Sequence, residues 1–209
     1  MRLGKWCYPV FGCVFVAASG CSYNAHVVST SSAASEIRLD KHVDENVAYS
    51  LSSELDNLHK EVKPSSYVCS AHKYPLEAGA AIRESIRSVL DQAFLEVYRT
   101  TSPGESSPGT KYQLNFDLEE FQPRLTFSPG FWSATIDSNV ELVLKVRVMD
   151  SNGDEIIRTM VSGHGSENGS GQCGDGSKYL ADATQEAIER TLENFIYKTI
   201  NSDYFASAE

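Results

Sequence analysis

Two stretches of the chain repeat apolar residues at the three- and four-residue spacing of an amphipathic helix. The first spans residues 76–98 and the second residues 178–200, and polar or charged residues fill the positions between. This spacing gathers the apolar side chains on one helical face, so each stretch predicts a helix that packs on a core. The two stripes are Leu76, Ile82, Ile86, Val89, Leu90, Ala93, Phe94 and Val97, and then Leu180, Ala183, Ala187, Ile188, Leu192, Phe195, Ile196 and Ile200.

Between these helices the apolar period changes to two, which indicates strands with one buried and one wet face. Residues 112–118 and 132–148 alternate in this way, and Asn152-Gly153 then predicts a hairpin turn before a returning strand over residues 155–163. Val47 to Leu51 and Tyr67 to Ser70 are further candidate strands. The order predicts an α+β fold of two layers, in which a mainly antiparallel sheet of about four to five strands carries two helices packed on one face.

The chain begins with the layout of a secretory signal peptide over residues 1–20. Basic Arg2 and Lys5 precede an apolar run that ends in small residues. This run is shorter than the roughly 20 apolar residues that cross a bilayer, so a permanent membrane helix is the weaker alternative.

The small residues lead directly into a cysteine, and Ala18-Ser19-Gly20-Cys21 resembles the bacterial lipobox. The resemblance implies removal of residues 1–20 and a lipid on Cys21, which anchors the chain to a membrane. Ala18 stands where a lipobox usually has Leu, so an ordinary cleaved signal peptide stays open as an alternative. Ser22, as the residue after the cysteine, implies sorting to the outer membrane, with the domain facing the periplasm.

Charge and composition narrow what the mature chain could bind. The formal net charge is -10, and removal of Arg2 and Lys5 would make it -12. A chain this acidic is a poor partner for nucleic acid or anionic lipid, and nucleic-acid binding is excluded as a function. Residues 21–35 are rich in Ser, Ala, Thr and Val without a sustained period and predict a flexible tether. The rest, residues 36–209, has the size of a single domain.

Two cysteines remain in that domain, Cys69 and Cys173, and an oxidising compartment favours a disulfide between them. Each lies seven residues before the first apolar residue of a predicted helix. In the predicted order the helices run the same way, so both cysteines should lie at one end of the fold. Free thiols are one alternative, and a metal site with His72 and Asp175 is another.

Candidate catalytic motifs are weak. The histidines are scattered, and neither His164-Gly165-Ser166 nor Gly169-Ser170-Gly171 forms the Gly-x-Ser-x-Gly turn of a nucleophile elbow. The glycine-rich run over residues 163–177 predicts a flexible loop. We therefore expect a protein that is not an enzyme and that holds no cofactor and no catalytic metal.

One segment, residues 121–132, gathers aromatic residues and two prolines between two predicted strands. Exposed apolar residues at a hairpin end can mark a contact with a partner or with a membrane. The alternative is that they pack under a helix as a small satellite core. The candidate contact residues are Phe121, Leu125, Phe127, Phe131 and Trp132.

The lipobox, the helices, the strand pair and the Asn152-Gly153 hairpin together resemble the YajG-type outer-membrane lipoproteins, on pattern over most of the mature chain. Similar layouts occur in auxiliary lipoproteins of the PqiC and LptE types. The resemblance implies a lipid-anchored scaffold or accessory subunit that binds a protein partner in the periplasm, within an envelope complex. The alternative is a lipid or envelope-polymer binder that uses an apolar groove between helices and sheet. An envelope hydrolase has the least support.

Overall fold

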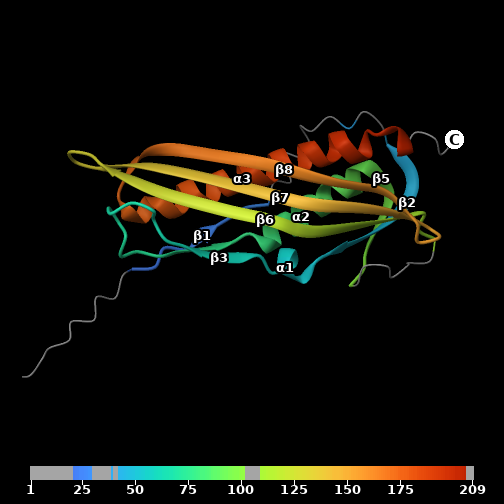
Figure 1. The fold of residues 1–209 in the computed structure, drawn as a ribbon, viewed down its shortest axis with the longest axis horizontal. Coiled ribbons are helices and arrows are strands. Elements are labelled where there is room, and N and C mark those ends of the chain that lie inside the picture. The colour runs from blue at the N-terminus through green and yellow to red at the C-terminus, as the bar shows by residue number, and fades with distance from the viewer. Residues whose placement is uncertain (1–20, 30–38, 40–41, 102–108, 206–209) are drawn as a thin grey trace, which may run out of the picture.

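The computed structural model describes residues 21–29, 39, 42–101 and 109–205. Its larger sheet has five strands in the order β5-β2-β6-β7-β8 (Figure 1). Strands β6, β7 and β8 form a long antiparallel meander, whereas β2 lies parallel to both β5 and β6. The bounds are Val43–Leu51 for β2, Phe94–Arg99 for β5, Tyr112–Pro129 for β6, Ala134–Asp150 for β7 and Glu155–Gly171 for β8. The α+β class is confirmed, but the sheet is mixed.

A second sheet has three strands in the order β1-β4-β3, which the sequence analysis did not predict. Its strands are β1 Ala25–His26, β3 His59–Val62 and β4 Tyr74–Glu77. Strand β1 lies parallel to β4, with Ala25 opposite Leu76. The expected tether therefore differs from the structure at its start, because this part of it is bonded into a sheet and Ala25 is buried.

Three α-helices accompany the sheets among the described residues, where two were predicted. They are α1 Ser53–Asp56, α2 Gly79–Ala93 and α3 Gly176–Phe195, and a π-helical turn, Ile196–Ile200, continues α3. The predicted helix over residues 76–98 was too long at both ends. Phe94 leaves the helix with an extended backbone and begins β5, whereas Leu76 belongs to β4.

Helix α3 contacts both sheets. It packs mainly along β8 and β7, and it also contacts β1 and β4 of the small sheet. Helix α2 adjoins α3 and β5. The buried stripes of both helices match the predicted ones, apart from the residues that the shorter α2 leaves out. The layer between helix and sheet is filled by side chains that are at most 1% exposed, among them Leu125, Phe127, Ile136, Val140, Leu142, Leu180 and Phe195.

Strand β8 has 17 residues where nine were predicted, because residues 164–171 continue it where a flexible loop was expected. Its glycines allow α3 to lie directly on the strand. A Cβ atom at Gly165 would stand 1.8 Å from the carbonyl oxygen of Ala183, and one at Gly163 would stand 2.2 Å from that of Ala187. These glycines therefore belong to a strand on which a helix packs closely, and not to a flexible loop.

The outer edge of β8 is bonded by side chains of the C-terminal helical region. Lys198 donates to the carbonyl of Met160 at 3.1 Å, and Asn194 donates to that of Ser162 at 2.7 Å. The Ser166 amide donates to the Glu186 carboxylate at 2.7 Å. Three backbone groups that could pair with another strand are thus occupied within the chain.

Candidate functional site

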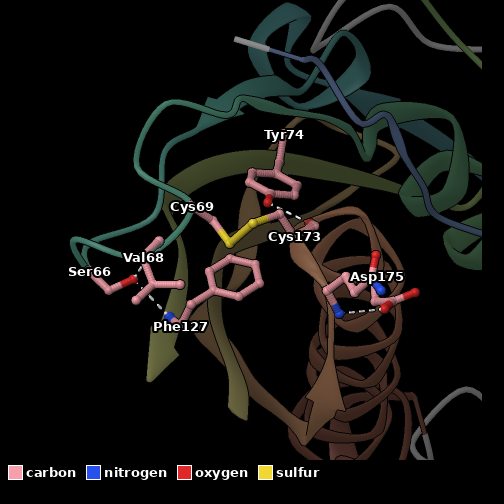
Figure 2. Close-up of a disulfide and its surroundings, with 8 residues drawn as sticks. Ser66, Val68, Cys69, Tyr74, Phe127, Cys173 and Asp175 are labelled. Carbon is pink, nitrogen blue, oxygen red and sulfur yellow. Dashed lines mark hydrogen bonds between the residues drawn. A yellow bond between two sulfur atoms is a disulfide. The ribbon is translucent and has the colours of Figure 1, made fainter. Parts of the chain in front are cut away.

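One end of the molecule holds the disulfide that the sequence favoured. Cys69 and Cys173 are joined across 104 residues, with their Cα atoms 5.6 Å apart (Figure 2). As expected, both lie at the end where α3 begins. Cys69 sits in a turn with a φ of 60°, so the strand predicted at Tyr67 to Ser70 was wrong.

The disulfide is fastened to the core by a buried tyrosine. The Tyr74 hydroxyl donates to the Cys173 carbonyl at 2.6 Å, and burial raises the pKa of this phenol to about 12. The Tyr74 ring stacks on Phe127 with centroids 6.0 Å apart (Figure 2). Asp175 closes the short turn after Cys173 by accepting from the Gln172 amide at 2.7 Å. The segment at the start of α3 is therefore held on both sides.

The five candidate contact residues separate into two groups. Phe121, Leu125 and Phe127 are buried, being 8%, 0% and 1% exposed, and belong to the core. For these three the contact hypothesis was wrong, because strand β6 runs through to Pro129 and points them at the helix layer. Phe131 and Trp132 lie in the β6–β7 turn and are 89% and 91% exposed.

The exposed pair borders an open cleft of about 370 Å³ beside the disulfide. The two rings meet edge to face with centroids 4.8 Å apart. Apolar and backbone surface from three segments lines the cleft, and the lining includes Val68, Cys69, Pro129, Phe131, Trp132 and Cys173. Sequence reasoning found the two aromatic residues but missed the cleft, since it forms only when segments far apart in the chain meet.

Cys21 lies at the same end, with an exposed and unpaired thiol. Its carbonyl accepts a hydrogen bond from the Lys73 amide at 3.3 Å, and the Tyr23 amide donates to the Lys73 carbonyl at 2.9 Å. The Tyr23 ring also stacks on Tyr74, with centroids 5.8 Å apart. The predicted lipid attachment site is thus fixed against the domain rather than joined to it by a free segment.

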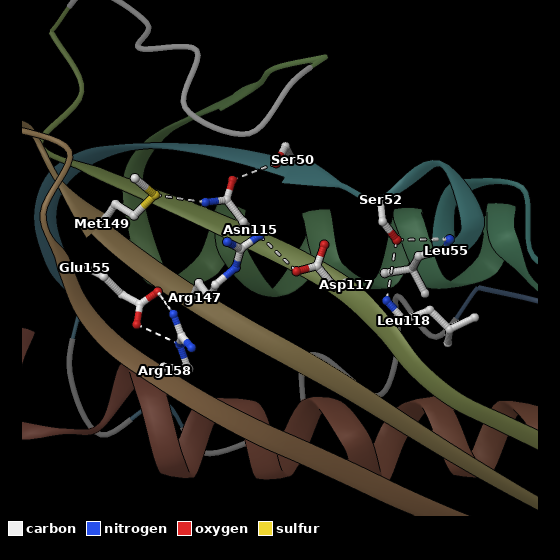
Figure 3. A network of polar contacts seen from close by, with 10 residues as sticks. All are labelled: Ser50, Ser52, Leu55, Asn115, Asp117, Leu118, Arg147, Met149, Glu155 and Arg158. Atoms are coloured by element: carbon white, nitrogen blue, oxygen red, sulfur yellow. Dashed lines mark hydrogen bonds and ion pairs between the residues drawn. The ribbon is translucent and has the colours of Figure 1, made fainter.

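A polar cluster on the larger sheet consists of side chains that bond one another (Figure 3). Ser50 donates to buried Asn115 at 2.7 Å, and Arg147 bonds Asp117 across strands at 3.0 Å. Arg158 makes two hydrogen bonds to Glu155, which lowers the pKa of that carboxyl. Each of these charges is paired with a neighbour, and the Arg147–Asp117 pair joins β7 to β6.

Within the described residues, no group of three or more His, Cys, Asp or Glu side chains could hold a metal ion. In the same part of the chain, no helix has the length and apolar character needed to cross a membrane. The predicted signal peptide, residues 1–20, lies outside the described residues.

No family model matches this chain. Solved structures that resemble this chain in part include one from Helicobacter pylori provisionally described as a neuraminyllactose-binding hemagglutinin homologue. It has a TM-score of 0.43 and 8% identity, over 79% of this chain and 88% of that one. A protein from Caulobacter crescentus provisionally described as a lipoprotein has a TM-score of 0.35 and 12% identity, over 49% and 72% of the two chains.

A minor lipoprotein from Acinetobacter baumannii is a further similar structure, with a TM-score of 0.29 and 10% identity, over 79% of this chain and 94% of that one. At TM-scores of 0.29 to 0.43 and identities of 8% to 12%, these likenesses support no conclusion about the fold or the function of this chain.

Proposed function

We propose that this protein is a lipid-anchored lipoprotein of the bacterial envelope, held on the outer membrane with its domain in the periplasm. There it acts as a scaffold or accessory subunit for a protein partner. The observation that carries the proposal is the position of Cys21. Its thiol is exposed and available for lipid attachment. Its backbone carbonyl accepts a hydrogen bond from the amide of Lys73, the residue before β4, at the disulfide end.

This attachment suits a scaffold because it leaves no free segment between lipid and domain. From Cys21 the chain passes at once into β1, which is paired with β4. The meander beyond it is long: β6 has 18 residues, so at about 3.3 Å per residue it extends roughly 60 Å. A lipid at one end of such a domain would hold the other end at a set distance from the bilayer, where a partner could meet it.

The alternative function, a lipid or polymer binder, required an apolar groove between helices and sheet. In the described residues that layer is filled, with Leu125 and Val140 both 0% exposed. Opening a groove there would mean separating α3 from β7 and β8. The packing therefore favours the scaffold over the binder, and the YajG-type assignment stays a prediction from sequence.

Lipid labelling and crosslinking in cells test this function. The full chain, produced in a bacterial host with a labelled fatty acid, should incorporate label and appear in the outer-membrane fraction. Cys21→Ser should lose the label, whereas the neighbouring Ser22→Ala should keep it. Photocrosslinkers at exposed positions of the far hairpin, such as Asn152, should then capture a discrete envelope protein. Label that persists in Cys21→Ser would refute the anchor, and crosslinks to no protein would refute the scaffold role.

A further inference from the structure

Three aromatic side chains at the disulfide end are almost entirely exposed. Tyr67 is 95%, Phe131 89% and Trp132 91% exposed. A large apolar side chain left in water forgoes about 1.5–3 kcal/mol of burial free energy. Phe131 and Trp132 contact each other but not the core, whereas Phe127, four residues earlier, is fully packed. Packing within the chain therefore does not account for these three exposed aromatic side chains.

These side chains lie at the end of the molecule that carries Cys21. The Cys21 carbonyl is bonded by Lys73, and the His72 amide donates to the Cys69 carbonyl at 3.0 Å. The disulfide from Cys69 then borders the same cleft as Phe131 and Trp132. In Figure 1 the β6–β7 turn projects from this end, well away from the β7–β8 turn. A lipid on Cys21 would therefore bring this end to the membrane.

Charge is distributed unevenly between the two ends of the meander. Residues 63–73, 128–135 and 170–178 form the tip of the disulfide end and contain a single carboxylate, Asp175, which the Gln172 amide bonds. Their cationic side chains are Lys63, Lys73 and Lys178, of which Lys73 pairs with Glu61. The next carboxylate along the meander is Asp137 on β7, opposite Thr126 and Asn168. The opposite β7–β8 turn contains Asp150, Asp154 and Glu155. In a chain of net charge -10, the tip nearest Cys21 therefore carries no excess of carboxylates that would repel anionic headgroups.

We propose that the disulfide end is a second membrane contact, in which Tyr67, Phe131 and Trp132 enter the headgroup region of a phospholipid bilayer. The proposal rests on the lipid anchor at Cys21 for its orientation, and it assigns Phe131 and Trp132 to lipid rather than to a protein partner. Tyr and Trp favour this interface because each combines an apolar ring with a polar group. The lipid chain and the aromatic turn would then fix the tilt of the domain.

The sequence supplies its own probe for this contact. The chain has two tryptophans, Trp6 in the predicted signal peptide and Trp132, so the mature protein would report from Trp132 alone. The full chain from a bacterial host is reconstituted in vesicles of phosphatidylethanolamine and phosphatidylglycerol, with or without brominated acyl chains. We expect Trp132 emission to shift to shorter wavelength and to be quenched by the brominated lipid, with little quenching by aqueous iodide.

Matched variants assign the signal. Trp132→Phe should remove the tryptophan emission that brominated lipid quenches. Any emission left in this variant comes from protein that still carries Trp6, and the mass of the protein shows whether the signal peptide has been removed. Phe131→Ser and Tyr67→Ser should each weaken the quenching. Tyr197→Ser should leave it unchanged, because Tyr197 is also exposed, at 76%, but lies on the turn that ends α3.

The outcomes separate the two proposals. Protein that floats with vesicles while Trp132 stays open to iodide would overturn the membrane contact and leave the anchor intact. Protein that carries no lipid refutes the anchor, and mixing it with preformed vesicles still tests the contact through the same quenching. A photocrosslinker at position 131 that captures a protein instead of lipid in cells would also overturn the contact.

Discussion

Gly165 marks the closest approach of strand β8 to helix α3, and Gly165→Ala tests that packing with a single methyl group. The added Cβ would stand 1.8 Å from the Ala183 carbonyl oxygen and 2.7 Å from the Ala187 amide nitrogen. Real Cβ contacts are essentially never shorter than 3.0 Å, so strand and helix must separate by at least 1.2 Å, the difference between 3.0 and 1.8 Å. Both opposing atoms belong to the helix backbone, so a side-chain rotation cannot relieve the clash.

The expected loss of stability follows from that separation. Overpacking a core by one methyl group typically costs 1–3 kcal/mol. A gap of 0.5–1 Å between packed surfaces already forfeits a quarter to a half of their dispersion energy. Because α3 packs on β8 along much of its length, we expect Gly165→Ala to lower the free energy of unfolding by about 3 kcal/mol or more.

Urea denaturation followed by far-UV circular dichroism measures this change. His164→Ala is the matched control, since His164 is the exposed neighbour on the same strand, and its substitution should change stability by no more than about 0.5 kcal/mol. A Gly165→Ala loss below about 0.5 kcal/mol would show that α3 does not lie this close to β8.

Three further predictions concern the disulfide, the aromatic segment and the two ion pairs of Asp56. Replacing Cys69 and Cys173 together with Ser should lower the unfolding free energy by up to about 4.7 kcal/mol, the chain-entropy value for a loop of this length; a thermal melt unchanged by reductant would contradict it. Phe127→Ser should cost about 3–5 kcal/mol in urea denaturation because the ring is buried, whereas Phe131→Ser should cost no more than about 0.5 kcal/mol; equal losses would place both rings in the core or both outside it. Asp56 accepts hydrogen bonds from Arg83 and Arg99, each at 2.8 Å, which hold its carboxyl pKa below the ordinary value of 3.8. Its stabilisation is therefore present above about pH 4 and lost as pH falls through the lower folded pKa, so Asp56→Asn should be less stable at pH 7, by up to about 1 kcal/mol, and the gap should close in acid; a gap independent of pH would rule out the ion pairs as its cause.

Sequence pattern identified the parts of this fold that have one clear period. The stripe from Leu180 to Ile200 is amphipathic over its whole length, and it forms a continuous helical region. Strand β7 alternates over most of its length, and Asn152-Gly153 supplies its turn, where Gly153 has a φ of 88°. The disulfide followed from these elements, because their order places both cysteines at one end.

The errors lie where a local pattern fits two structures. Phe94 and Val97 continue the helical spacing of the preceding stripe, yet they also suit a short strand, and pairing with β2 decides for the strand. Gly163 and Gly165 look like loop residues until a helix lies on them. The start of the predicted tether forms a strand of two residues, which is too short to show an alternating period. It forms a strand because it pairs with β4, where Ala25 lies opposite Leu76.

The aromatic segment shows the same limit for the candidate site. Phe127 and Phe131 are similar in sequence context, but a register that continues to Pro129 buries the first and leaves the second in the turn. The distinction depends on pairing between strands rather than on residue type.

Under the proposed lipid anchoring, the hydrogen bonds that α3 and the turn after it make to the rim of β8 would affect how neighbouring molecules meet on the membrane. Anchored proteins diffuse in two dimensions, meet one another often and meet in similar orientations, which is the situation most favourable to sheets joining side by side. Lys198, Asn194 and Glu186 already satisfy three of the groups through which such joining would begin. Even when crowded on a membrane, these molecules should therefore resist joining through the edge of β8 and should remain separate there.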